Sequence, residues 1–363
     1  MKTTFGKIAA TGVAAATALA IGLPAQAAEE VKLSTALGQK HDQSQALFAT
    51  FSKMMKKDES VVKINYIGGP EVTPNRKQGA AMKRGLIDII MSPTTYYANL
   101  VPEARVTGIS NMPPSEWRAN GGYDIMSKVW AEKLNAVILA WPNWYDQSIF
   151  YLWMKEKPKL DKVTGVSLKG LKFRTTPLYT PFLKAMGATT KNISPAEIYT
   201  SLERGVVDAL AWPEGGVAFR GWHRFIKYKV GPAFFRSTTF LTMNKDKFEK
   251  LPKKGQDQLM AAAMHYEKES GAILKGLVAK DDAKIAADGV TAYMVPGDYG
   301  KAFTATILKA NWADAEKRAG KMSVDFNLLK SKMLKSGSYL FNIFGFVGKT
   351  SQPFHRVPLG SYQ

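Results

Sequence analysis

The sequence predicts an α/β protein of two lobes with similar topology, built on mixed, mostly parallel sheets. From residue 31 onward, segments with strand and helix patterns alternate at lengths that suit strand-helix-strand units. Residues 83–93, KRGLIDIIMSP, are echoed 120 residues later by residues 203–213, ERGVVDALAWP. Each copy ends a helix at Arg-Gly, where glycine suits a left-handed cap, and continues as a strand that stops at proline. The echo predicts two lobes that meet at a crevice, although common helix-strand physics can also produce it.

The individual elements follow from hydrophobic periodicity and from turn residues. Strands are expected at 31–37, 61–67, 85–90, 137–141, 150–153, 171–174, 188–190, 206–212, 225–230 and 240–244. Helices are expected at 41–57, 74–84, 179–186, 198–204, 252–288 and 299–317. Ser194 and Glu197 form a capping-box pattern ahead of the helix at 198–204.

These elements divide the chain into segments. Residues 28–150 and about 236–260 are assigned to the first lobe, and residues 151–235 and about 285–320 to the second. The helix at about 253–288 is expected to link the lobes. The tail at 321–363 carries an apolar run and is expected to pack on the body or to make an oligomer contact, such as a homodimer.

The first 27 residues predict a secretory signal peptide. Lys2 and Lys7 precede an apolar run at 8–23, and Ala25-Gln26-Ala27 supplies an A-x-A cleavage pattern. We therefore expect cleavage after Ala27 and a periplasmic protein. The chain has no cysteine, which excludes disulfides, thiolate catalysis and zinc-cysteine sites.

The charge of the chain favours small anionic partners. The formal charge of +20 falls to +18 when Lys2 and Lys7 are removed. The lysines are spread singly, and the sequence contains no arginine-rich block, zinc finger or aromatic-basic RNA motif. Nucleic acid is therefore not expected as a partner. A positive field that attracts small anions, or merely keeps the protein soluble, is the better interpretation.

The most informative stretch is residues 168–177, LKGLKFRTTP. Leu171 and Phe173 alternate with Lys172 and Arg174, so a short strand sends Arg174 to the face opposite the core pair. Arg174 falls near the strand end, where open α/β sheets bind ligands, and a guanidinium can hold a carboxylate through two parallel hydrogen bonds. The alternative is an exposed arginine on a basic edge strand.

Four segments in order resemble the solute-binding proteins of tripartite ATP-independent periplasmic (TRAP) transporters. The resemblance extends over about residues 31–317 and lies behind the predicted signal peptide. The segments are Gly68-Gly69 through Arg84 to Gly85-x-x-Asp88, the stretch LKGLKFR at 168–174, SPAEIY at 194–199 through GVVD at 205–208, and NKDKFEKLP at 244–252.

The resemblance implies a two-lobed Venus-flytrap receptor, which is not an enzyme. Such a receptor closes on an organic acid and delivers it to a small and a large integral membrane subunit driven by an ion gradient. Arg174 matches the carboxylate-binding arginine of the family. Glu71 and His41 fall where the family often places ligand-facing groups. Tyr145 and Gln147 are cleft candidates because they lie in a loop between two apolar runs. Trp212, Glu214 and Arg236 are further candidate ligand contacts. His41 can equally cap the helix that follows it.

The sequence also departs from the family pattern. Many members have a second arginine ahead of the crossing strand, where this chain reads YDQS at 145–148. A branch that binds its substrate through a metal has an acid directly before the tryptophan matching Trp212, and here that neighbour is Ala211. Glu214 and Gln147 could still hold Na⁺ or Ca²⁺ through oxygen ligands. Arg236 could instead be a second anion contact or an exposed charge.

Two rival functions remain open. A periplasmic hydrolase would need a catalytic constellation, but no H-E-x-x-H or G-x-S-x-G motif occurs. Glu71 and Glu214 could form an acid-base pair across a cleft, although nothing fixes their separation. An ABC-type or sensor-linked solute-binding protein would share the same fold and differ in its membrane partner.

Overall fold

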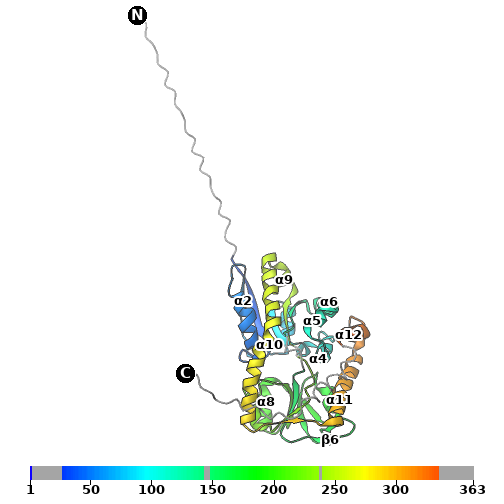
Figure 1. Ribbon diagram of the computed structural model, residues 1–363. Coiled ribbons are helices and arrows are strands. Elements are labelled where there is room, and N and C mark those ends of the chain that lie inside the picture. Colours follow the sequence, from blue (N-terminus) through cyan, green and yellow to red (C-terminus); the bar gives the residue numbers. More distant parts are fainter. Residues whose placement is uncertain (2–26, 143–147, 237–238, 335–363) are drawn as a thin grey trace, which may run out of the picture.

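The structure is a computed structural model that describes Met1 and residues 27–142, 148–236 and 239–334. It confirms the α/β class: two mixed sheets lie in two halves of the molecule, with helices packed against them (Figure 1). The predicted signal peptide and the part of the predicted tail from residue 335 lie outside the described residues, apart from Met1 and Ala27. No helix among the described residues is long and apolar enough to cross a membrane.

The first sheet is built mainly from the N-terminal part of the chain. Its five strands lie in the order β2 (Val62–Tyr66), β1 (Glu29–Thr35), β3 (Ile89–Pro93), β12 (Thr239–Asn244) and β4 (Ala136–Ala140). The pairings of β1 with β2 and β3 are parallel, and those of β12 with β3 and β4 are antiparallel. The late strand β12 thus returns to the first sheet, as the sequence predicts.

The second sheet repeats this order. Its six strands are β9 (Thr189–Asn192), β8 (Lys172–Thr175), β10 (Ala209–Pro213), β5 (Phe150–Met154), β11 (Tyr228–Gly231) and β13 (Thr291–Met294). β8 pairs in parallel with β9 and β10, and β5 pairs antiparallel with β10 and β11. β13 extends the edge by a parallel pairing with β11. A separate hairpin joins β6 (Lys159–Asp161) to β7 (Gly165–Ser167).

The sequence echo corresponds to one structural unit that occurs in both sheets. The Asp88 carboxylate accepts a hydrogen bond of 2.8 Å from the backbone N–H of Lys32 on β1. The Asp208 carboxylate does the same for Lys172 on β8, at 2.9 Å. Each aspartate therefore ties its own loop to the neighbouring parallel strand, and Arg174 on β8 occupies the position that Ser34 has on β1.

Helices cover both sheets. The shorter ones are α1 (Asp42–Leu47), α2 (Lys53–Met55), α3 (Gln78–Lys83), α4 (Ala104–Ile109), α5 (Pro114–Ala119), α6 (Gly122–Leu134), α7 (Thr180–Ala185), α8 (Ile198–Glu203), α9 (Lys245–Lys250) and α12 (Phe326–Met333). A π-helical turn at Phe48–Ser52 joins α1 to α2, and 3-10 turns lie at Thr94–Tyr97, Pro195–Glu197, Trp222–Phe225 and Ala319–Lys321. The long helices are α10 (Lys253–Ala287) and α11 (Gly297–Glu316).

Helix α10 links the two halves, as predicted (Figure 1). Near its start, Gly255 packs so closely against Val62 of β2 that a Cβ there would lie 2.8 Å from the valine side chain. Near its end, the Asp281 carboxylate accepts hydrogen bonds from the backbone N–H groups of residues 217–219, which follow β10. One rigid helix therefore contacts both sheets.

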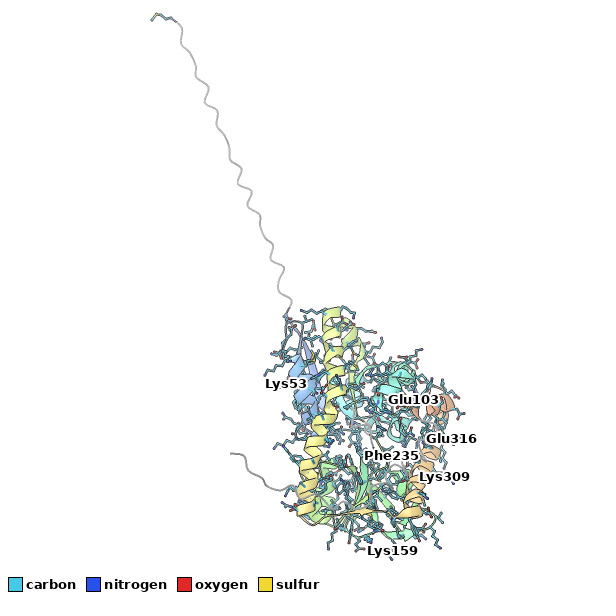
Figure 2. All side chains as sticks on the ribbon, viewed as in Figure 1. Lys53, Glu103, Lys159, Phe235, Lys309 and Glu316 are labelled. Atoms are coloured by element: carbon cyan, nitrogen blue, oxygen red, sulfur yellow. The ribbon has the colours of Figure 1, made fainter. Side chains whose placement is uncertain are left out.

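The chain crosses between the halves through segments that pair with each other. Phe235 lies where the halves meet (Figure 2), and its carbonyl accepts a 2.8 Å hydrogen bond from Ile149 N–H. The N–H of Phe234 donates to the carbonyl of Phe150 at 3.1 Å. These bonds, together with the packing of the rings of Phe150, Phe234 and Phe235 against one another, define the crossing region.

The structure also corrects several predicted bounds. The third strand begins at Ile89 rather than residue 85, because Gly85 is left-handed (φ +72°) and Leu86 is 60% exposed. The helix predicted at 74–84 begins only at Gln78. The hairpin of β6 and β7, the strand β13 and the helices α4 to α6 were not predicted.

Candidate functional site

Arg174 is buried near the end of β8, the strand next to the edge strand β9 of the second sheet. β8 lies between β10 and β9, and the Arg174 side chain is 0% exposed. Its Nε donates a 2.9 Å hydrogen bond to the carbonyl of Ile193. Neither of its terminal nitrogens, Nη1 and Nη2, has a hydrogen-bond partner of ordinary geometry among the described residues. The exposed edge-strand alternative is therefore wrong, since the arginine lies inside the molecule on an interior strand.

The surroundings of Arg174 are aromatic. The guanidinium carbon lies 5.5 Å from the centre of the Trp212 ring, a distance that allows a cation-π interaction. Burial lowers the pKa of Arg174, and the nearby hydroxyls of Tyr96 and Tyr179 act in the opposite direction. Arginine nevertheless stays charged in proteins, so a buried cation lies here, and the interaction with Tyr96 does not neutralise it. A buried cation of this kind is costly unless an anion pairs with it.

A small cavity lies beside this arginine, between elements of both sheets. Its volume is about 30 Å³, which is enough for one or two water-sized groups. It is lined by Leu37, His41, Gln43, Pro93, Thr95, Tyr96, Phe150, Thr176, Tyr179, Trp212, Pro213 and Thr239. Of the predicted site residues, His41 and Trp212 line this cavity, and Arg174 lies next to it, 5.5 Å from the centre of the Trp212 ring.

His41 caps the helix that follows it and also lines the cavity. Its Nδ1 accepts a 3.2 Å hydrogen bond from the backbone N–H of Gln43 and so caps α1. Burial, with the charge of Arg220, lowers the pKa of His41 well below its ordinary value, and the ring is therefore neutral. Because Nδ1 accepts, Nε2 carries the proton, and this buried N–H has no hydrogen-bond partner in the part of the chain that the structure describes.

A second arginine approaches the same site from a segment that the sequence analysis did not single out. The guanidinium of Arg220 lies 5.6 Å from the Trp212 ring centre and 5.2 Å from that of Trp222. Its Nη2 donates a 3.2 Å hydrogen bond to the carbonyl of Leu37, in the loop after β1. Arg220 thereby joins the loop after β10 to the first sheet. The only sequence signal was one arginine close after the glycine pair that follows Trp212.

Asp42, the first residue of α1, is a buried carboxylate at the same junction. It is 6% exposed, and its Oδ2 has no hydrogen-bond partner within the described ranges 27–142, 148–236 and 239–334. Burial, followed by repulsion from Asp281, raises the pKa of Asp42 to about 6, although Arg220 opposes the shift. The ionised carboxylate is therefore disfavoured in the folded protein.

This shift predicts a pH-dependent effect of Asp42→Asn. An acid whose pKa is raised on folding contributes stability that is fully present below its ordinary value and is lost as the pH rises through about 6. We expect the variant to melt up to about 5 °C above the wild type at pH 8 and close to it at pH 4. Differential scanning fluorimetry across this range is the measurement, with the exposed Asp124→Asn as control. A constant difference at all pH values would contradict the assignment.

The other predicted site residues lie apart from the cavity. Glu71 is exposed and folds back so that its Oε1 accepts a 2.6 Å hydrogen bond from Gly69 N–H. The Glu214 carboxylate lies 3.6 Å from the Lys229 ammonium, and burial raises its pKa despite this cation. Arg236 donates from Nε to the carbonyl of Asn111 at 3.1 Å. None of these three lines the cavity beside Arg174. Tyr145 and Gln147 lie outside the described residues.

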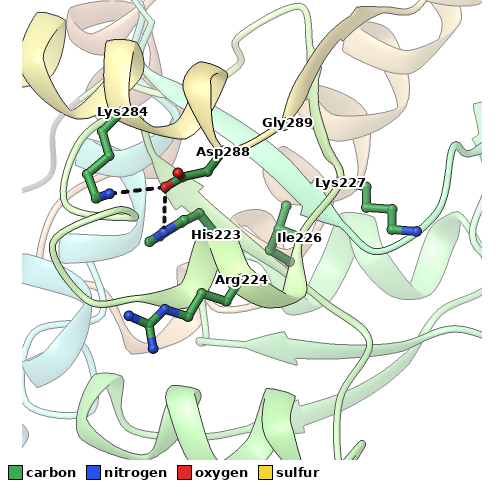
Figure 3. A pocket seen from close by; sticks show the side chains of 7 residues that line it. All are labelled: His223, Arg224, Ile226, Lys227, Lys284, Asp288 and Gly289. Carbon is green, nitrogen blue, oxygen red and sulfur yellow. Dashed lines mark hydrogen bonds and ion pairs between the residues drawn. The ribbon is translucent and has the colours of Figure 1, made fainter.

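A larger pocket, of about 430 Å³, lies elsewhere in the second half, between the turn at 222–225 and the end of α10 (Figure 3). His223 Nε2 lies 2.9 Å from a carboxylate oxygen of Asp288, and Lys284 pairs with the same group at 3.1 Å. A histidine-aspartate pair can support a hydrolytic serine, but the seven lining residues include no serine, threonine or cysteine. The pocket therefore does not present a hydrolase triad.

The matching sheets, the helix that spans them and the arginine at their junction define a two-lobed ligand-binding receptor. Residues 159–317 match the family model described as bacterial extracellular solute-binding protein, family 7. This match agrees with the resemblance to TRAP transporter solute-binding proteins found in the sequence, and the solved structures with a similar fold include proteins of that kind.

Individual relatives support this assignment. A solute-binding protein of Verminephrobacter eiseniae is 24% identical over 314 residues, covering 83% of this chain and 88% of the relative. A TRAP periplasmic solute-binding protein of Desulfovibrio salexigens, solved with bound orotic acid, has a TM-score of 0.71 at 17% identity, covering 84% of this chain and 98% of the other. A TRAP solute-binding protein of Bordetella bronchiseptica, with copurified calcium and picolinate, has a TM-score of 0.70 at 18% identity, covering 84% and 92%. At these identities the solved structures establish the shared fold.

Proposed function

We propose that this receptor captures an organic acid between its lobes and that Arg174 holds the carboxylate. The observation that carries the proposal is the buried guanidinium fork beside an interlobe cavity, whose two terminal nitrogens have no hydrogen-bond partner of ordinary geometry among the described residues. A carboxylate offers two oxygens that match this fork through charge-assisted hydrogen bonds. The orotic acid and picolinate bound by the two solved relatives carry such a group. The small cavity implies that the lobes open to admit a solute and close on it.

The direct test is to identify the bound solute. Mass spectrometry of the denatured, freshly purified protein is expected to reveal a copurified carboxylic acid. The same acid should then raise the melting temperature of ligand-free protein, because a ligand that binds only the folded state stabilises it. Prolonged incubation should return the acid unchanged. Formation of a product would instead favour the hydrolase alternative.

A metal ion is not required by the described residues. Of the two predicted metal ligands, Gln147 lies outside these residues, and Glu214 lies 3.6 Å from the Lys229 ammonium, which would compete with a cation. The described residues contain no group of three or more histidine, aspartate or glutamate side chains arranged to hold a metal. We propose recognition of the carboxylate by Arg174 itself.

Metal removal tests this point. Dialysis against EDTA is expected to leave the ligand-induced shift in melting temperature unchanged. A shift that disappears with EDTA and returns with added Ca²⁺ would contradict direct recognition and favour a cation bridge. Calcium is the ion to test first because one solved relative contains copurified calcium. Sodium can be tested in the same way by replacement with choline.

The location and partners follow from the family. We propose export to the periplasm with cleavage after Ala27, which N-terminal sequencing of the secreted protein would check.

We also propose that the receptor delivers its solute to TRAP small and large membrane subunits, rather than to an ABC-type or sensor partner. Reconstituted uptake that depends on an ion gradient, and not on ATP, would support it. Light scattering of the purified protein tests the predicted homodimer.

A further inference from the structure

Three buried polar atoms, none of which has a hydrogen-bond partner among the described residues, converge at Gly216. They are Nε2 of His41, Nε1 of Trp212 and Oδ2 of Asp42. They lie 3.9, 3.9 and 3.8 Å from the point that a Cβ on Gly216 would occupy. The three side chains are 2%, 3% and 6% exposed, so bulk water does not satisfy these atoms. Unsatisfied groups this deeply buried are rare in folded proteins and call for an explanation.

The space at this point exists because two successive glycines follow β10. Gly215 and Gly216 both have left-handed backbones, with φ of +88° and +76°. A Cβ on Gly215 would lie only 2.7 Å from Asp42 Oδ2, so α1 approaches the loop directly. The loop is fixed from behind by the carboxylate of Asp281, which accepts hydrogen bonds from the N–H groups of residues 217–219. The space is thus a fixed feature of the fold.

The chemistry of the three atoms specifies the group that fits them. His41 Nε2 and Trp212 Nε1 are N–H donors, and the Asp42 oxygen is an acceptor. A hydroxyl group can accept two hydrogen bonds and donate one, so it satisfies all three atoms. A ketone oxygen would leave the aspartate unpaired, and an ammonium would face two donors.

The position of Trp212 connects this point to Arg174. The indole that contributes Nε1 also has the Arg174 guanidinium 5.5 Å from its ring centre. The ring of His41 lies edge-on to the same indole, at 6.2 Å between ring centres. A single small molecule that lies along Trp212 can therefore reach both groups.

We propose that His41, Asp42 and Trp212 form a hydroxyl-binding subsite, so that the solute is a hydroxy acid. Its carboxylate pairs with Arg174, and its hydroxyl lies among the three polar atoms, at van der Waals distance from the Gly216 backbone. The inference rests on the proposed capture of a carboxylic acid, and it adds a second recognition element that selects among acids.

Matched acids test the subsite. Isothermal titration calorimetry would compare butyrate with its three monohydroxy derivatives, benzoate with its three, and the copurified acid with its deoxy analogue. We expect one hydroxyl position to tighten Kd by about 10- to 100-fold over the parent acid, because the parent leaves buried donors and an acceptor unpaired. The O-methyl ether of the best acid should lose this gain, since it cannot donate to Asp42. This comparison uses wild-type protein, so it does not depend on whether a variant folds.

Two variants separate the subsite from the carboxylate site. Trp212→Phe removes one donor and keeps an aromatic ring, so it should reduce the hydroxy-to-deoxy affinity ratio about 10-fold. Arg174→Lys should weaken both acids and leave that ratio unchanged. Equal Kd values for hydroxy and deoxy acids in the wild type would overturn the subsite and leave only a bound water there, while the proposed function stands. If no carboxylic acid binds at all, the proposed function fails and the subsite fails with it.

Discussion

Replacing Arg174 with alanine is expected to abolish the ligand-induced rise in melting temperature and to weaken Kd by about 100-fold or more. The guanidinium is fully buried, and its Nη1 and Nη2 have no hydrogen-bond partner of ordinary geometry among the described residues. Its loss would leave the substrate carboxylate buried without a cation, and truncating one member of such a pair costs about 2–5 kcal/mol. Calorimetric titration with the copurified acid is the measurement.

Two further variants make this result specific. Arg174→Lys keeps the charge but not the planar fork, so it should recover only part of the affinity. Arg204→Ala removes an exposed arginine near the end of α8 and should bind as the wild type does. Full affinity in Arg174→Lys would contradict two-point recognition of the carboxylate. Full affinity in Arg174→Ala would remove Arg174 from the site altogether.

Much of the fold was predictable because the strand patterns can be recognised within short segments and one helix-strand pattern occurs twice in the chain. Strand periodicity placed most of the strands of both sheets, and the Arg-Gly-x-x-Asp echo revealed that the sheets share one topology. The sequence did not reveal what the aspartates do. Asp88 and Asp208 reach back to the backbones of Lys32 and Lys172, which lie 56 and 36 residues earlier. Such contacts depend on the order of the strands in the sheet, and this order cannot be inferred from the periodicity of a single segment.

The site was predictable only in part, for the same reason. Arg174 could be found because a lone arginine near a strand end, in a family-like stretch, has a local signature. The contribution of Arg220 and Asp42 arises only when α1 meets the loop after β10, as the hydrogen bond from Arg220 to Leu37 shows. Glu214 had the right chemistry and a nearby position in the sequence. Its side chain instead pairs with Lys229 on β11, a strand that continues the sheet on the other side of β5.

Closure of the site also depends on how the lobes are joined. Arg76, after β2, donates a 2.6 Å hydrogen bond to the side chain of Asn192 at the end of β9. Arg105 on α4 donates to the carbonyl of Pro177 and pairs with Asp314 on α11, at 3.2 and 3.3 Å. These bonds connect the two halves beside the segment that contains Arg174. Helix α11 is thus part of the framework that holds the second half in place. Its packing against the second half is therefore important for the stability of the protein.

Gly165→Ala is expected to be the most destabilising single methyl addition in this framework. A Cβ on Gly165 would lie 2.3 Å from the backbone nitrogen of Phe303 and 2.4 Å from the carbonyl oxygen of Tyr299, both on α11. Backbone atoms cannot rotate away as a side chain can, so β7 and α11 must separate. Gly165 also has a left-handed φ of +81°, which adds strain for alanine. We expect a loss of about 4 kcal/mol or more in the free energy of unfolding, which urea titration would measure.

Gly170→Ala is the matched control for this change. Gly170 has nearly the same backbone angle, φ +84°, but a Cβ there meets nothing within 4 Å. Its substitution should cost only about 1–2 kcal/mol, the strain of a left-handed alanine. The difference between the two variants isolates the collision with α11 from the backbone strain that they share. Equal losses would mean that α11 does not pack directly on β7, and a retained ligand shift in a folded Gly165→Ala would show that the Arg174 site forms without that contact.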